Sequence, residues 1–195
     1  MKLIALFFIF CSRGVVANEN TNIYFSQEIP KNKKQSIDFR ISMFTISPFY
    51  RALGLGAGYR IKIGNNFSWK VVEYNNFSSQ NLGLSHKLLE QYRISTVAPP
   101  FIKQQLLSEI IYTPLIYKWL WLDQKIVWSR IDISLGLGNS KWSELGKVSV
   151  SSLGAQFVFN LKTDRSLFWS LRNLIYDNSK IEPELEFALG TEFNF

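Results

Sequence analysis

The chain has 195 residues, of which 47% are hydrophobic, 15% aromatic and 19% charged, and its formal net charge is +7. This length suits one domain. The basic residues are scattered, with no block longer than Lys31–Lys34, so the charge pattern argues against a nucleic-acid partner. One cysteine, Cys11, and one histidine, His86, exclude a disulfide framework within one mature chain and a multi-histidine centre. We therefore expect no metal and no cofactor.

Residues 1–17 are expected to form a cleaved secretory signal peptide. Lys2 supplies the positive charge, Leu3–Phe10 is a short apolar run, and small or tolerated residues precede a cut after Ala17. The run is too short to span a bilayer as a helix, which needs about 20 residues. Lipidation of Cys11 is disfavoured because the bulky Phe10 precedes it. A buried N-terminal strand or helix is the other interpretation.

Residues 18–34 are polar and contain Pro30 with several Asn and Lys residues, which predicts an N-terminal periplasmic arm. No later segment is apolar over the length of a transmembrane helix. Only helices and closed barrels satisfy every backbone polar group in lipid. If residues 35–195 enter a membrane, they must therefore do so as a β-barrel.

Alternation of apolar and polar residues with a period of two runs through these residues and predicts strands. The predicted strands are Ser36–Met43, Arg51–Ile61, Phe67–Tyr74, Gln105–Thr113, Arg130–Gly138, Ser152–Phe159, Leu167–Tyr176 and Glu184–Phe195. Tight turns are expected at Lys62–Asn66 and Asn160–Ser166, a long and partly helical connection at Phe77–Phe101, and an intermediate one at Thr113–Lys125. With both termini periplasmic, the tight turns fall on the periplasmic side. The predicted fold class is an all-β, eight-stranded antiparallel up-and-down transmembrane β-barrel.

The polar faces of the predicted strands decide between this barrel and a soluble sheet. A soluble sandwich points its apolar face inward, whereas a membrane barrel turns that face to lipid and encloses the polar one. Here the polar faces combine glycine and serine with charges of both signs. Together these favour a narrow lumen holding an ion-pair network, although solvated charges on a soluble periplasmic sheet are the alternative. The predicted network comprises Arg40, Arg60, Glu109, Arg130, Asp132, Arg172, Glu186 and Glu192.

Two further groups of residues indicate a membrane location. Aromatic side chains suit the boundary between hydrocarbon and headgroups, and the predicted girdle comprises Tyr112, Tyr117, Trp119, Trp121 and Trp128. The last strand places apolar residues on one face and stops on phenylalanine, as expected of an insertion signal for the barrel-assembly machinery: Phe187, Leu189, Phe193 and Phe195. The expected partners are outer-membrane lipid and that machinery, in a Gram-negative envelope.

Four segments give the chain a resemblance to a known family. They are Ile23-Tyr24 before Pro30-Lys31, the glycine-rich Gly54–Tyr59, Arg172-Asn173, and the terminal Phe193-Asn194-Phe195. In these the chain resembles small proteobacterial outer membrane β-barrel domain proteins, related in shape to OmpA/OmpX-type barrels. The family would carry an acidic residue at Asn173. The resemblance implies fold and location, and no activity.

Catalytic interpretations have little support from the residues. A serine hydrolase needs a histidine held in fixed geometry, and His86 lies beside Ser85 in the long predicted connection. A lipid-modifying or hydrolytic barrel using His86 is therefore kept only as the alternative function. Glu184 and Glu186 share a strand face and suit ion pairing. Because an eight-stranded barrel is just wide enough for its side chains to fill, we expect a structural or interaction role rather than a wide pore.

Overall fold

The computed structural model describes residues 33–47, 50–81, 100–121, 125–162, 164–179 and 181–195; for residues 45–50, 80–81 and 119–126 it describes no side chains. The expected signal peptide, most of the expected polar arm and His86 lie outside this part of the chain. Within it the chain forms strands β1 (Gln35–Ser47), β2 (Tyr50–Lys62), β3 (Phe67–Asn81), β4 (Ile102–Trp121), β5 (Lys125–Trp142), β6 (Gly146–Asn160), β7 (Arg165–Tyr176) and β8 (Glu184–Asn194).

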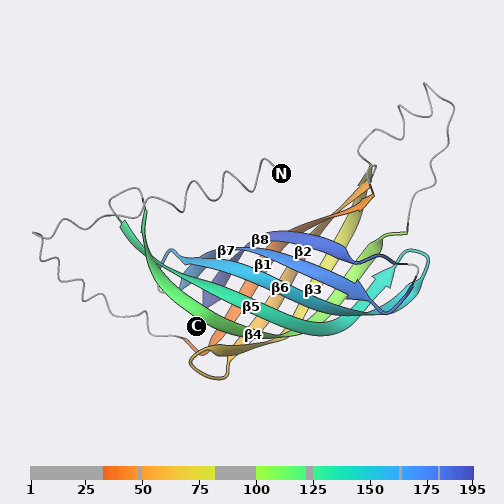
Figure 1. Ribbon diagram of the computed structural model, residues 1–195. Helices are drawn as coiled ribbons and strands as arrows, with labels where there is room; N and C mark the ends of the chain where they lie inside the picture. The colour runs from red at the N-terminus through yellow and green to blue at the C-terminus, as the bar shows by residue number, and fades with distance from the viewer. Residues whose placement is uncertain (1–32, 48–49, 82–99, 122–124, 163, 180) are drawn as a thin grey trace, which may run out of the picture. The chain divides into compact units, whose positions relative to one another are not determined.

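The eight strands close into one antiparallel barrel in chain order (Figure 1). β8 pairs with β1 from Ser36↔Asn194 to Phe44↔Glu186. The Phe195 backbone N–H donates to the Gln35 carbonyl oxygen at 3.0 Å, so the seam continues beyond the last strand. The predicted fold class, an eight-stranded up-and-down barrel, is confirmed. No helix in the described ranges is long and apolar enough to cross a membrane.

The barrel has two ends that differ in their connections. The terminal end holds the start of β1, the end of β8, the turns at residues 63–66 and 161–164, and the connection at 122–124. The far end holds the connections at residues 48–49, 82–101, 143–145 and 177–183. The two turns predicted to be tight therefore do share an end with the termini, but short connections also occur at the far end.

Two segments predicted as connections are partly strand. Pairing between β4 and β5 continues from Leu115↔Ile131 to Trp121↔Lys125, so most of residues 113–125 forms a paired hairpin, because its apolar and aromatic residues suit strands. Pro114 lies at the irregularity between Tyr112 and Leu115, where no ladder hydrogen bond is needed from its nitrogen. Likewise β3 continues to Asn81, into the long connection expected from Phe77.

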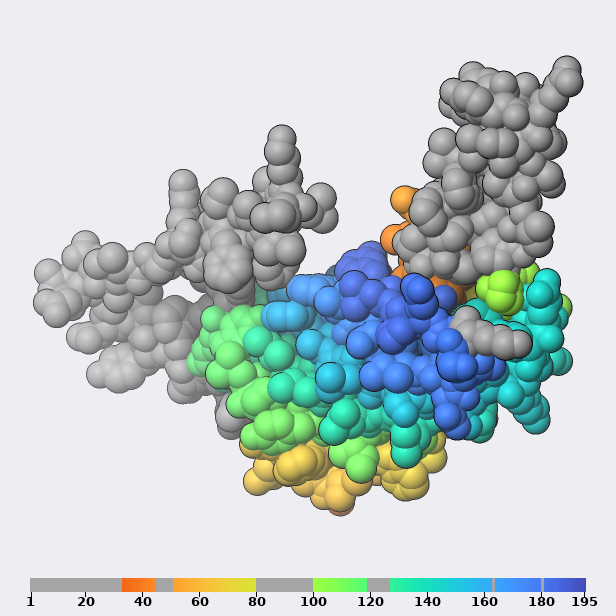
Figure 2. Space-filling view, turned by 45° about the vertical axis from the view of Figure 1, so that its right-hand side comes forward, coloured from red at the N-terminus to blue at the C-terminus, as the bar shows by residue number. Residues whose placement is uncertain are grey.

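The wall of the barrel carries apolar side chains outside and polar ones inside. On β1, Phe39 is 53% exposed and Arg40 only 3%; on β5, Leu137 is 70% exposed and Asp132 only 1%. Figure 2 shows the outer wall on one side, formed there largely by green to blue segments. This is the inverse of a soluble sandwich, and it gives the barrel the apolar belt that lipid requires.

Glycines on the inner face make room for charged side chains on the neighbouring strands. Across the ladders, Asp38 pairs with Gly58, Arg40 with Gly56 and Gly190, Glu109 with Gly136, and Arg172 with Gly154. A Cβ atom at Gly154 would lie 2.5 Å from Cγ of Arg172, and one at Gly136 would lie 2.6 Å from Cγ of Glu109. The stems of the charged side chains therefore occupy the space that a Cβ atom would need.

Among the described glycines, a Cβ atom would come closest to a backbone atom at Gly138, and Gly138→Ala should destabilise the barrel by about 1–3 kcal/mol. Its Cβ atom would lie 2.0 Å from the backbone carbonyl oxygen of Leu106 on β4, so the two strands would have to separate. The measurement is urea-induced unfolding in lipid vesicles. Gly64→Ala is the control, because nothing lies within 4 Å of a Cβ atom there. Equal effects of the two changes would contradict the steric explanation.

Candidate functional site

The candidate functional site is the lumen, which inward side chains fill in three layers. The terminal charge cluster consists of Ser36, Arg60, Thr113, Arg130, Asp132 and Glu192. The central charge cluster consists of Asp38, Arg40, Lys70, Glu73, Glu109, Arg172 and Glu186. The apolar plug consists of Phe44, Ala52, Phe77, Ile102, Leu107, Trp142, Val148, Val150, Leu174 and Tyr176. On the strands that carry both kinds of residue, the charged positions lie nearer the terminal end and the plug residues nearer the far end.

Arg172 on β7 is the centre of the central charge cluster. Its Nη2 atom lies 2.6 Å from Glu73 Oε1 and 2.8 Å from Glu186 Oε2, and its Nη1 atom lies 3.0 Å from Glu109 Oε1. These carboxylates come from β3, β8 and β4, so one guanidinium connects opposite walls. Planar guanidinium groups suit such contacts because several N–H donors are fixed in one plane.

Arg40 and Lys70 complete the cation set of this cluster. Arg40 contacts Asp38 at 2.7 Å and Glu73 at 2.8 Å, and its guanidinium carbon lies 5.4 Å from the centroid of the Phe168 ring. The Lys70 Nζ atom lies 2.9 Å from Glu73 Oε2. The cluster thus places four carboxylates (Asp38, Glu73, Glu109 and Glu186) against three cations (Arg40, Lys70 and Arg172). Each of these three cations contacts at least one carboxylate of the cluster.

The terminal charge cluster is balanced, with two arginines against two carboxylates. Arg60 Nη2 lies 2.8 Å from Asp132 Oδ2, and Arg130 Nη2 lies 2.6 Å from Glu192 Oε2. Arg60 also contacts Glu192 at 3.4 Å, and Arg130 contacts Asp132 at 3.2 Å. The Thr113 hydroxyl donates to Asp132 at 2.7 Å, and Ser36 donates to Glu192 at 2.8 Å. Each of the two carboxylates is therefore contacted by both arginines and by one hydroxyl group.

All eight charged residues named from the sequence point into the lumen, but they fall into these two clusters rather than one network. Glu73 was missed. Strict alternation from Phe67 and Trp69 would place it on the outer face, and an irregularity in the β3–β4 register between Lys70 and Glu73 turns it inward. The adjacent Val71 and Val72 take up the extra position. Two consecutive β-branched apolar residues before an acidic one were the signal in the sequence.

The apolar plug corrects the expectation of a polar lumen along the whole barrel. Phe44 and Phe77 lie with ring centroids 5.0 Å apart, and Trp142 and Tyr176 lie edge to face at 5.2 Å. The apolar surfaces of these side chains fill the closed interior by packing, and the Tyr176 hydroxyl donates to Glu184 at 3.1 Å. The polar interior therefore occupies only the part of the lumen nearer the terminal end.

The two glutamates that share a face of the last strand and were expected to suit ion pairing, Glu184 and Glu186, have separate partners. Glu186 binds Arg172, with oxygens 3.0 and 3.1 Å from its Nη2 and Nε atoms. Glu184 accepts a hydrogen bond from the Tyr176 hydroxyl at 3.1 Å, beside the apolar plug. Within the described ranges, no group of three His, Cys, Asp or Glu side chains is placed to hold a metal ion.

The expected girdle residues lie at the terminal end of β4 and β5. Tyr112 is exposed on the outer face, with its ring centroid 5.0 Å from that of Phe67. Trp128 is half-buried, and the Lys118 ammonium lies 4.6 Å from its ring centroid. Tyr117 is also half-buried. For Trp119 and Trp121 only the backbone is described.

The residues expected to form the insertion signal all lie on the outer face of the closing strand or directly after it: Phe187, Leu189, Phe193 and Phe195. Phe193 packs edge to face on Phe39 of β1, with centroids 6.2 Å apart. A further aromatic contact, not among the residues named from the sequence as the girdle, is the stack of Phe157 on Trp169, with centroids 4.3 Å apart and planes within 8°.

Comparisons with known proteins support the fold. No protein-family model and no curated protein matches the chain. The N-terminal β-barrel domain of OprF from Pseudomonas aeruginosa is 12% identical, with a TM-score of 0.50 over 84% of this chain and 98% of that one. Ail, the attachment invasion locus protein of Yersinia pestis, is 14% identical with a TM-score of 0.44 over 84% and 99%. Neisserial surface protein A is 13% identical with a TM-score of 0.42 over 83% and 96%. On its inverted faces and its likeness to the OprF domain, the protein has the fold of an eight-stranded transmembrane β-barrel.

Proposed function

We propose that the protein is an integral outer-membrane barrel of a Gram-negative envelope, with its terminal end toward the periplasm and a structural or interaction role. The observation that carries this proposal is that the lumen is filled in series by the terminal charge cluster, the central charge cluster and the apolar plug. A solute would have to displace buried ion pairs and then buried aromatic rings. The proposed role is therefore that of a membrane-embedded wall or platform, rather than a wide pore.

This proposal is tested by conductance in planar bilayers. The purified protein should give no stable unitary currents at voltages where a 16-stranded porin, which has an aqueous channel, conducts steadily. The physical reason is that each layer closes the lumen by direct side-chain contact. Large and stable unitary currents would refute the filled-lumen role. Release of the protein from membranes by carbonate alone would refute the integral location.

We also propose that the last strand is the signal read by the barrel-assembly machinery. Deleting Phe195 should reduce the amount of folded barrel in the outer membrane while export continues, because the deletion removes an exposed ring and the hydrogen bond to Gln35 that extends the seam. Fractionation and heat-dependent gel migration measure this. Leu161→Ser is the control, because Leu161 is an exposed apolar residue in a turn at the same end. Normal assembly of the truncated protein would contradict the proposal.

A further inference from the structure

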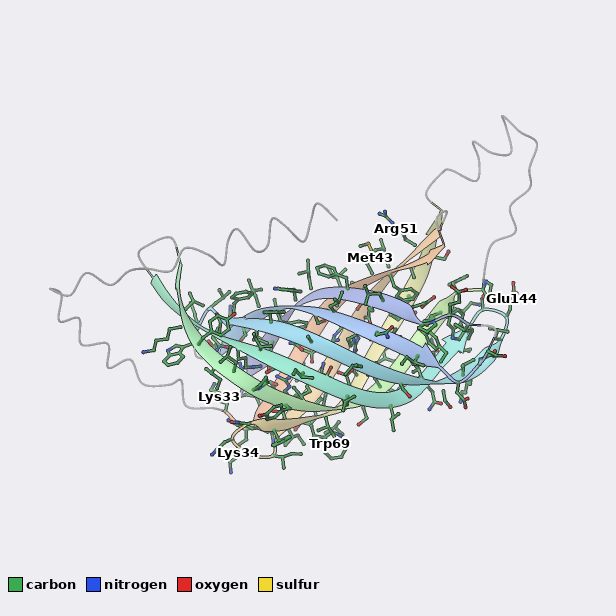
Figure 3. The ribbon with its side chains drawn as sticks, in the orientation of Figure 1. Lys33, Lys34, Met43, Arg51, Trp69 and Glu144 are labelled. Carbon is green, nitrogen blue, oxygen red and sulfur yellow. The ribbon has the colours of Figure 1, made fainter. Side chains whose placement is uncertain are left out.

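A small water-accessible vestibule opens at the terminal end of the lumen. It offers about 50 Å³ of space to water, which is room for more than one molecule. Its lining includes Lys33, Lys34, Arg60, Lys62, Arg130 and Glu192. Lys33 and Lys34 are labelled at this end in Figure 3, with Glu144 at the opposite end. The remaining lining is neutral and mostly polar, so the charged lining residues are five cations and one carboxylate.

The positive charge of the vestibule is not neutralised by the lumen. Arg60 and Arg130 are balanced by Asp132 and Glu192. By contrast, no described carboxylate lies within 4.0 Å of the ammonium groups of the three lining lysines, Lys33, Lys34 and Lys62. Three positive charges therefore remain around a space that water can enter.

The barrel fixes the backbones of Lys34 and Lys62 and the ammonium group of Lys33. The Lys62 backbone N–H donates to the Lys34 carbonyl oxygen at 2.8 Å, which fixes the start of the described chain against the end of β2. The Lys33 ammonium donates to the Asn194 carbonyl oxygen at 3.1 Å. Arg130, with 17% of its side chain exposed, is the most accessible arginine of the two charge clusters. The cations therefore converge on one mouth instead of being spread over a surface.

Among the described residues, the far end of the barrel has no comparable excess of positive charge. Its described rim carries four basic residues (Arg51, Lys103, Lys141 and Lys147) and four acidic ones (Glu144, Asp177, Glu182 and Glu184). The concentration of positive charge is thus a property of the terminal end, and it does not follow from the overall charge of +7 alone.

We propose that the vestibule binds a phosphate group, either free or on a lipid headgroup of the leaflet at the terminal end. Lysine ammonium groups bind phosphate as point charges, and here three of them meet with the exposed edge of Arg130 around a polar space. Free phosphate and a headgroup phosphate are both anions with several acceptor oxygens, so either can contact more than one of these ammonium groups. This binding role goes beyond the proposed function: it does not depend on whether the lumen conducts, and only its headgroup form rests on the proposed membrane location.

In the first experiment, inorganic phosphate is titrated into the full chain, which is folded in a detergent with a sugar headgroup, and binding is measured by isothermal titration calorimetry. K34Q/K62Q should weaken the affinity by about tenfold or more, since two charges near a protein surface are lost. The matched control is K141Q/K147Q, which removes two lysines from the far end and should leave the affinity within about twofold. K34Q alone should give a smaller loss of phosphate affinity. Because Lys34 lies outside the strands, this single variant shows whether the loss in the double variant comes from a folding defect.

The second experiment separates the lipid source from the free one. The protein is extracted from vesicles containing phosphatidylglycerol, and the bound lipid is counted by native mass spectrometry. Phosphate binding that K34Q/K62Q weakens supports a site for free phosphate. Lipid retention that K34Q/K62Q loses and K141Q/K147Q keeps, without binding of free phosphate, supports a headgroup site. Binding of neither ligand, or equal losses in both double variants, overturns the proposal.

Discussion

Arg172→Ala should destabilise the folded barrel by about 3–5 kcal/mol, the range expected when one partner of a buried ion pair is removed. The reason is electrostatic. Arg172 contacts Glu73, Glu109 and Glu186, and without it four buried carboxylates would face only Arg40 and Lys70. Urea-induced unfolding in lipid vesicles, followed by tryptophan fluorescence, measures the change in the free energy of unfolding.

Arg165→Ala provides the matched control on the same strand. Arg165 lies 3.7 Å from Asp164, and the two side chains are 63% and 49% exposed. Such a pair is screened by solvent, and the Arg165 guanidinium carbon also lies 5.8 Å from the Phe193 ring centroid at an exposed site, so the substitution should change the free energy of unfolding by about 1 kcal/mol or less. If the two alanine variants unfolded at the same urea concentration, Arg172 would not be the centre of a buried cluster.

Leu135→Arg should cost about 2–4 kcal/mol, the penalty for an arginine facing lipid near the bilayer midplane. Leu135 is exposed on the outer face of β5, between Ile110 of β4 and Leu153 of β6, which are both exposed apolar residues. The charge would therefore enter the apolar belt. The measurement is the free energy of unfolding in vesicles.

Asn139→Arg is the control for this change, because Asn139 is exposed on the same face of β5 nearer the far end, where the outer residues become polar. Its cost should be about 0–1 kcal/mol, as near the membrane interface. A cysteine at position 135 should also react with a lipid-soluble probe, whereas one at the buried Ser134 should not. Equal costs for the two arginines, together with a shielded cysteine at 135, would show that this face does not meet lipid.

The sequence predicted the parts of this fold that depend on alternation alone. Apolar residues outside and charged residues inside follow from a period of two, and so do the eight strands. Alternation failed where the backbone departs from that period, as at the β3 irregularity that turns Glu73 inward. It also underestimated strand lengths, because the hairpin beyond Tyr112 keeps pairing past Pro114.

Which charged side chains contact one another in the lumen could not be predicted from the sequence, for a different reason. Arg172 of β7 contacts Glu73 of β3 and Glu109 of β4. Neither β3 nor β4 is a hydrogen-bonded neighbour of β7. Such contacts are set by the curvature and stagger of the closed barrel, not by spacing along the chain. The division into two charge clusters and an apolar plug depends on the same three-dimensional placement.

Because the contacts of Arg172 with Glu73 and Glu109 join strands that are not neighbours in the barrel, we expect them to form only once the barrel closes by pairing of β8 with β1. Their energy is then absent from any transition state in which the barrel is still open. Interactions of this kind slow unfolding without accelerating folding. Substitutions at Arg172 should accordingly act on the unfolding rate, and the central charge cluster would set how long an inserted barrel persists rather than how fast it inserts.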